Sequence, residues 1–75
     1  MTQRTKYLHF WYEISTTSAD PNGSKWQGEL RLGKDLADGR QELILDGRLV
    51  PGYFDTESQA RDAADAYARV YIDQL

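Results

Sequence analysis

The chain has 75 residues but no cysteine, and it contains a single histidine and two prolines. Without cysteine it has neither disulfides nor thiolate ligands, and His9 alone supplies no histidine pair for a transition metal. No apolar run approaches the roughly 18 residues of a membrane span, and the first residues lack the apolar stretch of a signal peptide. We therefore expect a soluble cytoplasmic protein without metal, cofactor or membrane segment.

Strong basicity is also absent: twelve acidic and nine basic side chains give a net charge of −3. Residues 1–54 carry seven side chains of each sign, so the acidic excess lies in residues 55–75. A nucleic-acid-binding domain is usually strongly basic, so this balance favours other partners.

Two segments alternate in polarity, as strands with one buried face do. In residues 6–15 we expect Leu8, Phe10, Tyr12 and Ile14 to point inward and Tyr7, His9, Trp11 and Glu13 outward. In residues 25–32 we expect Trp26, Gly28, Leu30 and Leu32 inward, with Gln27, Glu29 and Arg31 outward. The segment between them contains Pro21 and Asn22-Gly23, which predicts a turn.

Two shorter segments, 40–45 and 48–52, flank Asp46-Gly47, a dipeptide typical of a tight hairpin turn. Pro51 cannot donate to a strand ladder, so the last segment should be short or at an edge. Residues 33–39 are expected to form a loop.

The last segment predicts a helix over residues 57–74. Thr56 and Gln59 have the spacing of a capping box. An apolar stripe follows at three- and four-residue steps: Ala60, Ala63, Ala64, Tyr67, Val70 and Tyr71.

These elements predict one small α+β domain, with an antiparallel meander of three main strands and one C-terminal helix. A short fourth strand is an alternative that the sequence leaves open. A single helix covers only one face of such a sheet. Tyr7, His9 and Trp11 would then lie on the opposite face with Glu29 and Arg31. Either the loop at 16–24 or cross-strand neighbours partly cover these aromatics, or the aromatics form a binding face.

Catalysis has little support in the sequence. His9 is the only imidazole, the serines have no nucleophile elbow around them, and no phosphate-binding glycine loop is present. We expect no catalytic and no metal-binding residues. A protein partner, or a second copy, is favoured over nucleic acid; pairing through a sheet edge is a further alternative.

Parts of the chain resemble the plant ethylene-response-factor (apetala-type) DNA-binding domain, in which three antiparallel strands precede one helix. The stretch "KWQGELR" at 25–31 is similar to that family's second strand, and "RLVPGYFDTESQARDAADAY" at 48–67 is similar to its third strand and helix. Bacteriophage integrase arm-binding domains share this topology. The resemblance covers about half of the chain.

This resemblance implies DNA binding through the sheet, as the alternative to a protein partner. It assigns DNA contacts to Glu29, Arg31 and Arg48, while Val50 stands where the family has a contacting tryptophan. The chain departs from the family in two respects. Its first strand has no arginine after Tyr7, and the connection from Arg31 to Arg48 is longer. Both changes reduce the phosphate-neutralising charge on which DNA affinity depends.

Overall fold

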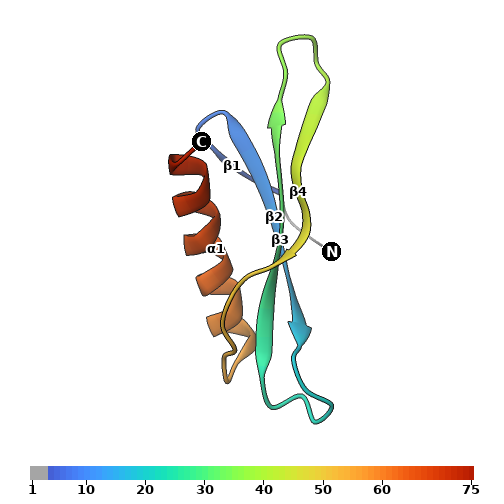
Figure 1. Cartoon of the computed structure of the whole chain (residues 1–75), viewed down its shortest axis with the longest axis vertical. Helices are drawn as coiled ribbons and strands as arrows, with labels where there is room; N and C mark the ends of the chain where they lie inside the picture. Colours follow the sequence, from blue (N-terminus) through green and yellow to red (C-terminus); the bar gives the residue numbers. More distant parts are fainter. Residues whose placement is uncertain (1–3) are drawn as a thin grey trace.

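A computed structural model describes residues 4–75 as a four-stranded antiparallel sheet with one helix on one side (Figure 1). The strands are β1 (Arg4–Tyr7), β2 (Phe10–Ser18), β3 (Trp26–Asp35) and β4 (Gln41–Leu49). They lie in sequence order, so the sheet is a meander, and α1 (Glu57–Asp73) follows. The predicted α+β class, the meander and the C-terminal helix are confirmed, whereas the strand boundaries differ from the prediction.

The predicted first strand, 6–15, is two strands joined by a tight turn. Tyr7 pairs with Phe10, and Leu8 lies between them with a φ of 57°, in the left-handed region. A chain reversal places the two paired residues on the same face, whereas a continuous strand would place positions 7 and 10 on opposite faces. The prediction that Tyr7 faces away from the helix is therefore wrong, as is the inward position of Leu8, which is exposed in the turn.

The predicted hairpin turn at Asp46-Gly47 is a β-bulge within one long strand. Leu30 pairs with Arg48 and Leu32 with Leu45, so Asp46 and Gly47 together lie opposite Arg31. Gly47 has a φ of +73°, which glycine adopts without a steric cost. The chain reverses instead at residues 36–40, where the amide of Leu36 donates to the carbonyl of Arg40. The loop expected at 33–39 thus begins later, because β3 extends to Asp35.

The helix packs on β2 and β3 and forms the core with their inward side chains. As predicted, the Thr56 hydroxyl caps it by accepting from the amide of Gln59 at 3.1 Å. The buried stripe of the helix lies on a different set of residues from the predicted one, and Val70, which was expected in it, is exposed. Its members are Ala60, Ala64, Ala68 and Ile72.

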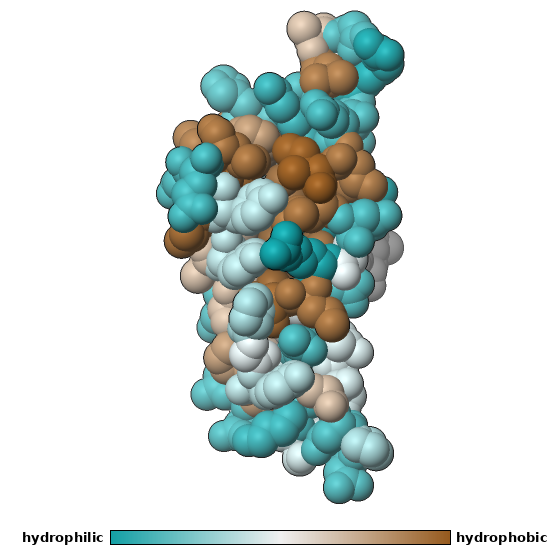
Figure 2. Space-filling model, in the orientation of Figure 1, coloured by the Kyte–Doolittle hydropathy of each residue, from teal (hydrophilic) through white to brown (hydrophobic). Residues whose placement is uncertain are grey.

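Small residues let the helix lie close to the sheet at its N-terminal end. A Cβ placed on Gly28 would lie 2.8 Å from the Cβ of Ala64 and 3.0 Å from the carbonyl oxygen of Ala60. The backbone of β3 and the helix therefore approach each other closely at Gly28. Further along, apolar side chains gather between α1 and β4, where Ile44 and Leu45 are partly buried (Figure 2).

Candidate functional site

The side of the sheet opposite α1 is not covered by any element of residues 4–75 (Figure 1). We call it the open face. Paired residues of antiparallel strands share a face, so the pairing registers place its side chains in rows across the strands. The open face includes Arg4, Lys6, Trp11, Glu13, Ser15, Glu29, Arg31, Gly33, Leu43, Asp46 and Leu49.

Trp11 lies on the open face, as predicted, but it is only 2% exposed. A Cβ on the neighbouring Gly33 would lie 2.3 Å from the indole ring, so the ring lies flat on the backbone of β3. The Arg4 guanidinium covers the ring at 3.9 Å from its centroid, and the Arg31 guanidinium lies at 5.8 Å. Of the two alternatives left open by the sequence, cover by cross-strand neighbours therefore applies to Trp11, because cation–π contacts with an arginine from β1 and one from β3 cover its ring.

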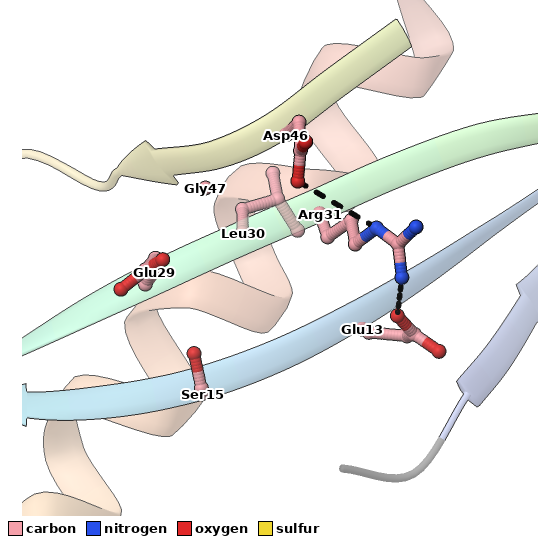
Figure 3. Close-up of a pocket in the computed structure, with 7 residues that line it drawn as sticks. All are labelled: Glu13, Ser15, Glu29, Leu30, Arg31, Asp46 and Gly47. Carbon is pink, nitrogen blue, oxygen red and sulfur yellow. Dashed lines mark hydrogen bonds and ion pairs between the residues drawn. The ribbon is translucent and has the colours of Figure 1, made fainter. Parts of the chain in front are cut away.

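Next to Trp11, four charged side chains form a row with one residue from each strand. This charged row consists of Arg4, Glu13, Arg31 and Asp46. Glu13 accepts from Arg4 at 3.3 Å. It also accepts from Arg31 at 3.2 Å, and Arg31 lies 3.7 Å from Asp46 (Figure 3). The sign of the charge alternates along the row.

A shallow depression of about 210 Å³ lies at the β3–β4 end of this row (Figure 3). Carboxylates of Glu13, Glu29 and Asp46 line it together with the Arg31 guanidinium and Ser15. These groups can bind complementary charges and hydrogen-bond donors. Within residues 4–75, no group of three or more histidine, aspartate or glutamate side chains is arranged to hold a metal ion.

The structure brings together three of the five residues predicted to bind a partner: Trp11, Glu29 and Arg31. Tyr7 instead lies on the helix side, where its hydroxyl donates to Asp73 at 2.9 Å. That hydrogen bond raises the pKa of Tyr7 above its ordinary value. His9 lies exposed in the β1–β2 turn.

The sequence-based prediction missed Arg4, Leu43 and Asp46 as members of the site. Arg4 precedes the predicted strand, and no glycine marks the turn that folds β1 back against β2. Asp46 was assigned to a hairpin turn, whereas the bulge places its carboxylate beside Arg31. The dipeptide Asp46-Gly47 signals positive φ but does not tell a bulge from a turn.

The three residues that the DNA-binding resemblance singles out do not share a face. Glu29 and Arg31 lie on the open face. Arg48 pairs with Leu30, a core residue, which places it on the helix side of the sheet. Val50, at the family's tryptophan position, is 3% exposed and belongs to the core.

A second polar cluster lies on the helix side. The Tyr12 hydroxyl donates to Asp65, and Arg69 approaches the same hydroxyl at 3.4 Å. Burial and the hydrogen bond to Asp65 raise the pKa of Tyr12. This cluster fastens α1 to β2, and we assign it a structural role.

The helix α1, the one helix in residues 4–75, is not long and apolar enough to cross a membrane. Comparisons with protein-family models, with curated proteins and with solved structures found no match to this chain.

Proposed function

We propose that this protein is a non-catalytic binding module of the cytoplasm that binds a protein partner through the open face of its sheet. The observation that carries the proposal is the composition of that face. It combines a tryptophan covered by arginines, two exposed leucines and a row of ion pairs. Protein interfaces mix apolar anchors with arginine in this way.

The exposed apolar side chains lie on both sides of the charged row. Leu43 pairs with Gly33, next to Trp11, and is 44% exposed. Leu49 pairs with Glu29 and is 53% exposed. A partner that covers both leucines would also cover the arginines and carboxylates between them.

The charges of the face favour protein over nucleic acid. The basic side chains of Arg4, Lys6 and Arg31 each form an ion pair with a carboxylate of the sheet. Phosphates would have to compete with these carboxylates, and the remaining carboxylates would repel them. DNA binding through Glu29 and Arg31 stays the alternative proposal, without Arg48 on the same face.

The proposal is tested by capture experiments with variants of the open face. Leu43→Glu introduces a charge at the β4 end of the row that contains Trp11 and Gly33. Val70→Glu introduces the same charge on the outer side of α1, where Val70 is 56% exposed. We expect wild type and Val70→Glu to retain the same host protein and Leu43→Glu to lose it. Binding is then reconstituted with that purified protein and measured by calorimetry.

Equal retention by all three proteins would contradict the proposal. A mobility shift of duplex DNA that disappears in Arg31→Ala and weakens with salt would favour the DNA alternative.

A further inference from the structure

The charged row is complementary to itself. Its signs run positive, negative, positive, negative from β1 to β4, through Arg4, Glu13, Arg31 and Asp46. If two open faces stack with a two-fold axis parallel to the strands, β1 of one copy lies opposite β4 of the other, and β2 opposite β3. Arg4 then meets Asp46 of the second copy, and Glu13 meets its Arg31.

We propose that the partner of the open face is a second copy of this chain, packed face to face about that axis. The inference rests on the proposed function and specifies its partner. Isologous contact of one surface with itself is the commonest arrangement of soluble oligomers. Two sheets stacked in this way lie about 10 Å apart, within the reach of arginine and glutamate side chains.

The other rows fit the same axis. Ser15 on β2 would lie opposite Glu29 on β3 of the second copy, so that its hydroxyl can donate to the carboxylate. The exposed Leu43 on β4 would lie against the aliphatic part of Lys6 on β1. Each pairing occurs twice, because the axis exchanges the two copies.

A two-fold axis in the plane of the sheet but perpendicular to the strands is disfavoured. It would place β1 opposite β1 and β2 opposite β2. If this axis runs along the charged row, the rows of the two copies lie on each other, and Arg4 would face Arg4 and Glu13 would face Glu13. Like charges in contact oppose association, so the row selects the axis parallel to the strands.

Pairing of two β4 edges is also disfavoured. The pairing of β4 with β3 is interrupted by two bulges. One bulge is at Asp46-Gly47, and the other is at Ile44, which lies between the pairs Leu32–Leu45 and Gly33–Leu43. Bulges in edge strands interfere with the addition of another strand. The open face is the larger continuous surface.

The size of the face suggests a dimer of modest affinity. β2, β3 and β4 have 9, 10 and 9 residues, which corresponds to roughly 30 Å of strand. Four strands with their side chains are roughly 20 Å wide. Each copy would therefore bury roughly 600 Å² of surface in the dimer, which is at the lower end of the areas buried in specific interfaces. We therefore expect a dissociation constant in the micromolar range, so the measurement should cover protein concentrations from ~1 µM to ~1 mM.

The test exchanges one charge pair between two variants. Arg4→Glu would place two carboxylates in contact at both Arg4–Asp46 positions of the dimer. Asp46→Lys would place two cations there. We expect each variant alone to dissociate at least about tenfold more readily than wild type. An equimolar mixture should recover the dimer, because opposite charges then meet at both positions.

Sedimentation equilibrium gives the mass relative to the 8.6 kDa monomer, and circular dichroism checks that each variant is folded. Arg40→Glu is the matched control, because Arg40 lies in the β3–β4 loop with its side chain 78% exposed. It should dimerise like wild type.

A wild type that stays monomeric at ~1 mM would overturn the second copy as partner. So would variants that dimerise alone, or a mixture that fails to recover the dimer. These results are distinct from failure of the proposed function. A monomer that captures another protein in a Leu43-dependent manner would keep the open face as the site and replace its occupant.

Discussion

The two faces of this sheet are covered in different ways. On the helix side, Leu30, Leu32, Ala60 and Ala64 are fully buried by the packing of α1 on β2 and β3. On the opposite side, Trp11 is equally inaccessible, but arginine side chains cover it instead of a secondary-structure element. Arginine can bury its aliphatic part on apolar surface while its guanidinium stays hydrated. A buried tryptophan therefore does not require a second layer.

This comparison has a functional consequence. A helix can be removed from its face only by unfolding, whereas arginine side chains can rearrange when a partner arrives. In the binding proposed above, the ion pairs of the open face would be exchanged for contacts with the other molecule.

Substitution of Trp11 should break the open face most severely. We expect Trp11→Ala to lower the free energy of unfolding by about 3 kcal/mol, because a large buried side chain is removed. Domains of this size are stable by about 5–10 kcal/mol, so this is a large fraction. Urea unfolding followed by circular dichroism measures the loss.

Leu43→Ala is the control on the same row, since Leu43 is 44% exposed. Its cost should stay within about 0.5 kcal/mol. Equal costs for both substitutions would contradict the view that Trp11 anchors this face.

The helix-covered face is tested at Gly28. We expect Gly28→Ala to cost about 1–3 kcal/mol of unfolding free energy, because its Cβ would lie 2.8 Å from the Cβ of Ala64. Combining it with Ala64→Gly should recover part of this loss, since the second substitution removes the contacting methyl group. A double-mutant cycle from urea unfolding measures the coupling, and strictly additive costs would argue against a tight contact.

The smallest effect is expected away from both faces, in the loop between β2 and β3. Asp20 accepts there from the hydroxyl and the amide of Ser24, and these hydrogen bonds hold the pKa of Asp20 below its ordinary value. Because the pKa of Asp20 is lower in the folded than in the unfolded state, Asp20 stabilises the fold at pH values above its unfolded-state pKa. This contribution is lost as the pH falls through the folded-state pKa.

Asp20→Asn should therefore be slightly less stable than wild type at pH 7. The difference should disappear as the pH falls well below about 4, as thermal unfolding at several pH values can show. A difference that is independent of pH would contradict the role of the carboxylate charge.

Local patterns predicted the secondary structure where neighbouring residues determine it. The Thr56–Gln59 capping signal placed the start of α1, and alternation placed Tyr12, Leu30 and Leu32 inward. Patterns were misleading where one signal suits two structures. Asp46-Gly47 suits a turn and a bulge alike, and the reversal at Leu8 uses a left-handed residue that is not glycine.

About half of the candidate site was predictable. Alternation placed Trp11, Glu29 and Arg31 on the face away from the helix. Arg4 and Asp46 could not be assigned to it, because one reaches the face through a chain reversal and the other through an extra residue in β4. Either change alters which face a side chain occupies.

The sequence by itself determined the class of fold, because periodicity and capping act between residues that are close along the chain. Only the tertiary structure decided that Trp11 is buried and that charges alternate across four strands. Those properties depend on strand register, and a shift of one residue moves a side chain to the opposite side of the sheet.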